Sequence, residues 1–300
     1  MAQAVQVGTP LPSVARTSPG AFSWAWVGVI PFFLFAILFL ILPTAYLAIG
    51  GLQDPDGSFT LKHIGELFQP NILDSYWISL KISATTAIGG ALFGFLLAYA
   101  AILGGLPRSI RTALLTFSGV ASNFAGVPLA FAFIATIGPT GLITLFFMNV
   151  LGISFREIGF TIFSFWGLSI TYMYFQFPLM VLIMAPAIDG LKRDWREAAE
   201  NLGASSAQYW RYIALPILLP TLIGTTLLLF ANSFGAVATA YALTGSSLDI
   251  ITIQLYAQIR GDVLHNPNLG YAMALGMIAI TGISNGLYIW LRGRSERWLR

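Results

Sequence analysis

Six apolar runs in the chain are each long enough to cross a lipid bilayer, which takes about 20 residues of helix. Only 9% of the 300 residues are charged, against about 25% in a soluble domain, so the chain cannot present an ordinary wetted surface. The sequence therefore predicts an all-α integral membrane protein with six transmembrane helices. Their expected bounds are 24–50, 76–104, 113–138, 160–188, 217–243 and 270–291.

A seventh apolar run, Leu142 to Leu151, is too short to span a bilayer. We expect it to lie at the membrane interface or to pack within the protein. The first run is longer than the apolar part of a signal peptide and lacks a small-residue cleavage site, so we expect a retained anchor.

The distribution of basic residues predicts the orientation, because Lys and Arg are retained on the cytoplasmic side of a membrane. With the N-terminus inside, the outer side keeps only Lys62, Lys81, Arg156 and Arg260. The outer loops instead hold carboxylates, namely Asp54, Asp56, Glu66, Asp74, Glu157, Asp249 and Asp262. We therefore expect a multi-pass protein of the cell inner (cytoplasmic) membrane with both termini in the cytoplasm.

This orientation divides the chain into three parts. Residues 1–22, rich in Ser, Thr, Pro and Gly, are predicted to be a partly disordered cytoplasmic tail. A transmembrane domain follows at 23–291 and includes a long cytoplasmic loop at 189–216, and residues 292–300 form a second cytoplasmic tail.

The sequence lacks the motifs of an enzyme or a cofactor site. It contains no Cys, no GxxxxGK[ST] phosphate loop, no HExxH and no nucleophile elbow. His63 and His265 fall in outer loops, where we expect ordinary surface residues. The net charge of +3 follows from the inner basic residues and does not indicate nucleic-acid binding. We predict no cofactor, no metal and no catalytic residue.

The long cytoplasmic loop has the pattern of two short helices. Asp194, with Glu197 three residues later, is predicted to cap the first helix. One face of this helix is apolar and holds Trp195, Ala198, Ala199 and Leu202. Gly203 is predicted to end it, and Ser205 with Gln208 forms a capping box for the second helix. Taken alone, this pattern also fits an interfacial amphipathic helix without a partner.

Residues 197–216, EAAENLGASSAQYWRYIALP, match the spacing E-A-A, three residues, Gly, nine residues, Ile-x-Leu-Pro. This segment resembles the EAA loop of the membrane-spanning permease subunits of binding-protein-dependent (type I) ABC importers, and it looks most like the polyamine, iron and oxyanion group. In that family the first short helix inserts into a cleft on a separate ATPase. The resemblance implies ATPase coupling by Trp195, Glu197, Ala198, Ala199, Leu202 and Gly203.

The resemblance also implies partners and an architecture. Helices two to six would form the importer core, and the first helix would wrap a neighbour. The implied partners are two copies of an ATPase, a second permease and a periplasmic or extracellular solute-binding protein. A heterodimer of permeases is favoured over a homodimer, because the resembled group usually encodes two. ATP hydrolysis would then take place on a partner chain, with this chain as a non-catalytic subunit.

The main alternative is an ion-coupled secondary transporter or channel. Proton-coupled carriers place ionisable side chains at membrane depth, and none of the 12 carboxylates falls inside a predicted span. Sodium coupling through backbone carbonyls stays open on this ground, but it would leave the loop motif unexplained. A purely structural membrane protein is disfavoured by the Gly and Pro breaks within the spans.

Polar residues at membrane depth need partners or water. The sequence predicts a translocation path along spans three to five, with Asn123, Tyr172, Gln176, Asn232 and Ser233 as lining residues. For any one of them, a hydrogen bond between helices is the favoured alternative. The path carries no charge, which fits selection of the cargo elsewhere. Whether the cargo is a polyamine, an iron chelate, an oxyanion or another small solute stays open.

Overall fold

The computed structural model describes residues 25–245, 247–260 and 266–296. The predicted tail at 1–22 lies outside these residues, as do Asp262 and His265. The helices run in the order α1 (Ala25–Ala36), η1 (Ile37–Ile41), α2 (Leu42–Gly50), α3 (Lys62–Glu66), α4 (Pro70–Leu103), α5 (Arg108–Ala121), α6 (Val127–Ile137), α7 (Leu142–Leu151), α8 (Phe165–Asp189), α9 (Arg193–Asn201), α10 (Ser206–Tyr209), η2 (Trp210–Ala214), α11 (Leu215–Phe234), α12 (Val237–Thr244), α13 (Ile251–Arg260) and α14 (Pro267–Glu296).

Six helical stretches of the described residues are long and apolar enough to cross a membrane. They are Gly28–Gly50, Pro70–Leu103, Val127–Leu151, Phe165–Asp189, Ser206–Phe234 and Pro267–Trp290. The predicted fold class, an all-α protein with six transmembrane helices, is thereby confirmed. The orientation of the termini stays a prediction.

The chain divides into two units, residues 1–46 and 47–300. In the first unit, α1 continues through the π-helical turn η1 into the start of α2. Its apolar side chains are exposed, with Phe32 at 67% and Phe39 at 64%. Side chains of this kind need lipid or another protein around them.

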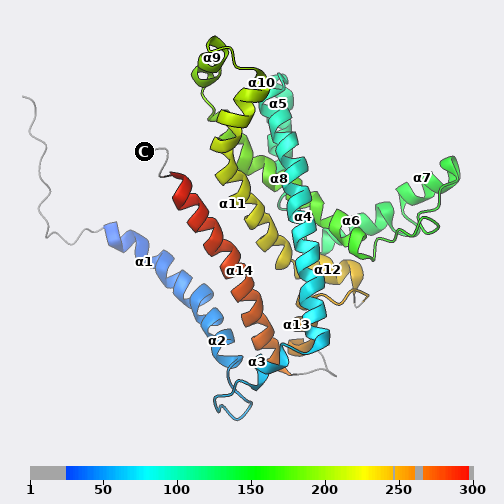
Figure 1. Ribbon diagram of the computed structural model, residues 1–300. Coiled ribbons are helices and arrows are strands. Elements are labelled where there is room, and N and C mark those ends of the chain that lie inside the picture. Colours follow the sequence, from blue (N-terminus) through cyan, green and yellow to red (C-terminus); the bar gives the residue numbers. More distant parts are fainter. Residues whose placement is uncertain (1–24, 246, 261–265, 297–300) are drawn as a thin grey trace, which may run out of the picture. The chain divides into compact units, whose positions relative to one another are not determined.

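The core of the second unit is built on α4 and α8 (Figure 1). Glycines let the two helices approach closely, because a Cβ added to Gly90 would lie 2.8 Å from the Cβ of Gln176. A Cβ on Gly94 would lie 2.5 Å from the Cβ of Met180. Small residues at such crossings are how membrane helices gain van der Waals contact without a hydrophobic driving force. Helix α11 packs against α4 and α8, and α14 against α11.

The predicted third span, 113–138, is divided between two helices in the structure. Helix α5 ends at Ala121, and α6 begins at Val127 after Gly126, whose φ of +75° is reached cheaply only by glycine. The turn between α6 and α7 is tight, with the Gly141 N–H donating to the Gly138 carbonyl at 2.9 Å. The apolar stretch in the structure therefore runs from Val127 to Leu151 and includes the short seventh run as α7.

Helix α7 projects away from α4, α8 and α11 (Figure 1) and buries none of its residues. Several other helix bounds differ from the predicted ones: α8 begins at Phe165 rather than at 160, and α14 begins at Pro267 and continues to Glu296, so the first part of the predicted tail at 292–300 is helical. Helix α4 begins at Pro70, so the exposed Asp74 lies in its second turn. The predicted fifth span, 217–243, is interrupted at Gly235 and Ala236, between α11 and α12.

Candidate functional site

Helix α9 forms the first half of the predicted coupling loop. It begins at Arg193, and the residue before it, Lys192, has extended backbone and no side-chain cap. The predicted cap by Asp194 is therefore wrong, because Asp194 already has helical backbone in the first turn. There its carboxylate still interacts favourably with the positive end of the helix dipole.

The end of α9 is a Schellman motif centred on Gly203. The Gly203 N–H donates to the Glu200 carbonyl and the Ala204 N–H to the Ala199 carbonyl, both at 2.9 Å. Gly203 has a φ of +79°, in the left-handed region that glycine adopts at low cost. The helix thus ends at the glycine that the sequence indicates.

The second half of the loop returns the chain to the membrane. The predicted capping box is present, since the Ser205 hydroxyl accepts from the Gln208 N–H at 3.3 Å and the Gln208 side chain accepts from the Ser205 N–H at 2.7 Å. Helix α10 widens into η2, where the Leu215 N–H donates to the Trp210 carbonyl. Pro216 explains the wide turn, because it lacks an N–H and its ring crowds the carbonyl four residues earlier.

The predicted apolar face of α9 is divided between two environments. Ala199 is 5% exposed and packs with Tyr209 and Ala214 in a small cluster that also includes the half-buried Trp195. Ala198 faces outward, and so does Leu202, which is 88% exposed. Half of the predicted face therefore anchors the loop on its own chain, and the other half is available to another molecule.

Leu202 and Gly203 border a groove of about 280 Å³, together with Gln208, Tyr209 and Tyr212. Glu197 is exposed on the preceding turn and forms no ion pair within the described residues. Two other charged residues of α9, Arg196 and Glu200, pair with each other, with Arg196 Nε donating to Glu200 Oε1 at 2.9 Å. This hydrogen bond and the charge of Glu200 raise the pKa of the Arg196 guanidinium.

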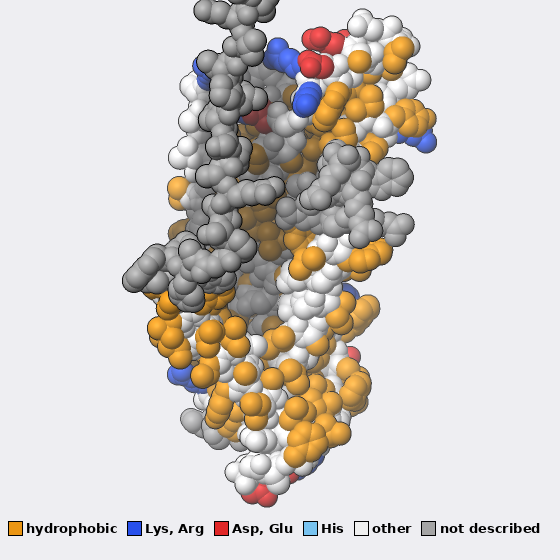
Figure 2. Space-filling model, turned by 90° about the vertical axis from the view of Figure 1, so that its left-hand side faces the viewer, with side chains coloured by type: hydrophobic (Ala, Val, Ile, Leu, Met, Phe, Trp, Pro, Cys, Tyr) orange, Lys and Arg blue, Asp and Glu red, His pale blue; other side chains and the backbone are white. Residues whose placement is uncertain are grey.

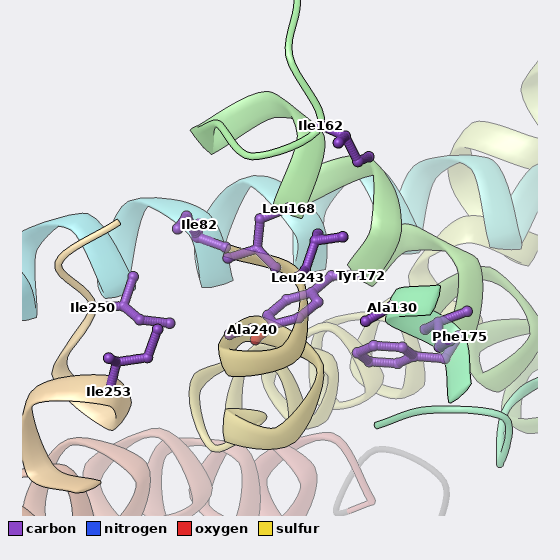
Figure 3. Close-up of a cluster of buried hydrophobic side chains, with 11 residues drawn as sticks. Ile82, Ala130, Ile162, Leu168, Tyr172, Phe175, Ala240, Leu243, Ile250 and Ile253 are labelled. Atoms are coloured by element: carbon purple, nitrogen blue, oxygen red, sulfur yellow. The ribbon is translucent and has the colours of Figure 1, made fainter. Parts of the chain in front are cut away.

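Three of the five predicted path residues are buried and join helices. The Tyr172 hydroxyl donates to the Ala236 carbonyl, and Figure 3 shows its ring among Leu168, Ala240 and Leu243. Gln176 Nε2 donates to the carbonyl of Leu229 at 3.0 Å. The Ser233 hydroxyl lies 2.8 Å from that of Thr86. These three residues therefore form hydrogen bonds that join helices, which is the alternative to a path-lining role that the sequence favours for each of them.

The other two path residues reach the surface. Asn123 lies in the break between α5 and α6, where its amide donates to the Gly119 carbonyl at 2.9 Å, and Asn232 is exposed on α11. The break at Gly126 is tied to α12, because the Gly126 N–H donates to the Thr239 hydroxyl at 2.7 Å. The two interrupted helices therefore meet at their breaks.

Sequence reasoning missed two partners of this polar set, Thr86 and Thr239. A signal for Thr86 was present, since small polar residues recur at helical spacing through Ser75, Ser79 and Ser83 on the buried face of α4. Thr239 offers no comparable signal, because its role depends on how α12 meets the start of α6.

The chain is similar to known transport proteins in sequence and in fold. No family model matches the chain. The chain is 28% identical over 127 residues to the spermidine/putrescine transport system permease protein PotC of Haemophilus influenzae, a match that covers 42% of this chain and 48% of PotC. It is 25% identical over 274 residues to the putative ferric transport system permease protein FbpB 1 of the same organism, covering 88% of this chain and 42% of the relative. The chain thus spans about half of the length of these two relatives or less.

The sulfate transport system permease protein CysT of Salmonella typhimurium is 23% identical over 233 residues, which cover 76% of this chain and 78% of CysT. Among solved structures, a chain of a bacterial ABC transporter involved in the import of the acidic polysaccharide alginate has a TM-score of 0.66 and 16% identity, over 91% of this chain and 95% of that chain. That likeness concerns the fold. By sequence and fold, the chain is similar to the permease subunits of ABC importers.

Proposed function

We infer that the chain is a membrane-spanning permease subunit of a binding-protein-dependent ABC importer and a multi-pass protein of the cell inner membrane. The similarity to importer permeases and the six membrane-spanning helices support this inference. The observation that carries the coupling role is the outer face of α9 and its C-cap, where Glu197, Ala198 and Leu202 are exposed beside the Gly203 turn and Glu197 forms no ion pair with a described residue. An exposed face on a helix whose C-terminal end is fixed by a Schellman motif is suited to docking against another protein.

The partner at α9 would be an ATPase chain that hydrolyses ATP for the assembly. In this proposal Glu197 supplies a charged contact, Ala198 permits close approach and Leu202 enters an apolar recess of the partner. Trp195 and Ala199 act from the other side, by fixing α9 on Tyr209 and Ala214. Gly203 sets the direction in which the chain returns to α11.

The rest of the assembly is proposed by analogy with the relatives. A second permease, different in sequence, would complete a path that one chain does not enclose. Two ATPase copies would dock on the two coupling loops, and a solute-binding protein would deliver cargo from outside. The exposed aromatic side chains of the first span, such as Phe32 of α1 and Phe39 of η1, support the proposal that this span wraps the second permease.

The path would run along α6, α11 and the breaks beside them. We assign the exposed amides of Asn123 and Asn232 to its lining. Tyr172, Gln176 and Ser233 would hold the surrounding helices together through their hydrogen bonds.

The relatives carry names of polyamine, ferric and sulfate systems, which differ in the sign of their cargo's charge. A neutral path with a few amide groups suits such variety if a binding protein selects the cargo. Ion-coupled transport is the less favoured alternative. Asp189, the carboxylate nearest the inner ends of the spans, is paired with Arg111 at 3.1 Å.

Replacing Glu197 by Lys tests the docking proposal. We expect the variant to insert and fold normally but to lose co-purification of the ATPase, because the charge at an exposed contact is reversed. Glu157→Lys is the matched control, since Glu157 is also exposed but lies between α7 and α8. Undiminished co-purification with Glu197→Lys would refute the assigned contact.

A further inference from the structure

A second groove, which shares Tyr209 with the first, lies between α9 and the end of α4. Its volume is about 560 Å³. One wall is apolar and comes from α4, with Ile102 and Leu103. The other wall is charged and comes from Lys192, which precedes α9, and Arg193, which begins it. Figure 2 shows charged side chains gathered at the end of the molecule that carries α9, while hydrophobic side chains predominate on the visible described face below.

The charged wall is not neutralised. Of its three basic side chains, Arg196 is paired with Glu200 at 2.9 Å. Lys192 and Arg193 are exposed and form no ion pair with any residue that the structure describes. One further carboxylate, Glu197, also lines the groove. The lining therefore keeps an excess of one positive charge, concentrated where Lys192 and Arg193 meet the apolar wall.

The groove also contains aromatic side chains of the kind found at the level of lipid headgroups. The rings of Tyr99 and Trp210 meet edge to face, with their centroids 5.1 Å apart, and both residues line the groove. Trp and Tyr are enriched where membrane helices cross the interface. Helix α4 also ends here, at Leu103. A molecule in this groove would therefore have its polar end among headgroups and its apolar end beside the span.

We propose that this groove binds one anionic phospholipid of the leaflet next to α9. Its phosphate would lie between Lys192 and Arg193, and an acyl chain would follow Ile102 and Leu103. Basic side chains next to a membrane attract anionic lipid in this way. A lipid held by both walls would link the end of α4 to α9. The inference needs only a chain embedded in a membrane, and it does not depend on the importer function.

The test measures lipid retention by the purified full chain with native mass spectrometry. The chain is stripped of lipid in detergent and then given phosphatidylglycerol or phosphatidylcholine with identical acyl chains. We expect phosphatidylglycerol to be retained at least several-fold better. Each of Lys192→Gln and Arg193→Gln should weaken that retention by roughly fivefold, whereas inorganic phosphate at millimolar concentration should not displace the lipid.

Arg211→Gln is the matched control, because Arg211 is exposed on η2 beside Tyr212 and does not line the groove. This variant should retain phosphatidylglycerol as the unsubstituted chain does. Equal retention of the two lipids, an equal loss in all three variants, or displacement by inorganic phosphate would overturn the proposal. Loss of the lipid when an ATPase binds would also overturn it, since the groove would then belong to the protein partner.

Discussion

At the scale of single residues, Gly203 decides the shape of the coupling loop. Among the described residues, and apart from the chain neighbours of Gly203, no atom lies within 4 Å of a Cβ added at this position, so a side chain would find space there. The constraint is the φ of +79°, which costs a residue with a Cβ about 1–2 kcal/mol. A β-branched residue would therefore move the backbone rather than accept this conformation.

Gly203→Val is expected to abolish uptake and co-purification of the ATPase, while the chain still inserts in the membrane. The physical reason is that the Schellman motif is lost and α9 no longer projects at the same angle. Pull-down of the ATPase measures the effect. Gly152→Val is the control, because Gly152 also has positive φ (+70°) and open space around it but lies at the end of α7. Equal binding by the two variants would contradict the assigned role.

At the scale of helices, the fold depends on the close contact of α4 with α8. Both π-helical turns have a common local cause, since η1 and η2 each end one residue before a Leu-Pro pair, at Pro43 and Pro216. The sequence could indicate these two positions, because proline acts on its own helix. It could not indicate which glycines of α4 meet α8.

Gly94→Leu is expected to destabilise the chain by about 1–3 kcal/mol or more, as overpacking of a tight contact does. A Cβ at Gly94 would meet the Cβ of Met180 at 2.5 Å and the backbone oxygen of Phe177 at 2.9 Å. Thermal unfolding in detergent measures the loss. Gly282→Leu on α14 has no atom within 4 Å of its Cβ and should unfold near the temperature of the unsubstituted chain. Similar unfolding temperatures for both variants would show that the α4–α8 contact is not tight.

Local patterns of the coupling loop could be predicted from sequence, and tertiary partners could not. Gly203 and the pair Ser205–Gln208 act within their own turn, so the sequence indicates them directly. The start of α9 depends on where α8 ends, and the Asp194 cap was therefore misplaced. The polarity of Tyr172 and Gln176 predicts hydrogen bonds between helices, but their acceptors, Ala236 before α12 and Leu229 on α11, depend on helix packing and could not be predicted.

At the scale of the whole molecule, the account requires α9 to face the cytoplasm. The chain contains no native Cys, so single cysteines report their side of the membrane. With Ser58→Cys, we expect an impermeant maleimide to react from outside in intact cells. With Ser206→Cys, it should react only after permeabilisation. Both serines are exposed, Ser58 shortly before α3 and Ser206 at the start of α10, and Figure 1 shows α3 and α10 at opposite ends of the second unit. If Ser206→Cys reacts in intact cells, α9 lies outside the cell. The predicted orientation is then wrong, and a cytoplasmic ATPase cannot reach the proposed docking site.

The central claim is that ATP hydrolysis on a partner docked at α9 drives transport through this chain. Solute uptake into lipid vesicles tests it most directly, since a protein can shift between two states only by as much free energy as its ligands supply differentially. Vesicles with the second permease, the ATPase and loaded binding protein should accumulate solute when ATP is supplied. Vesicles with this chain alone should not accumulate it under a proton or sodium gradient. Concentrative uptake by the chain alone would contradict the account and favour a secondary transporter.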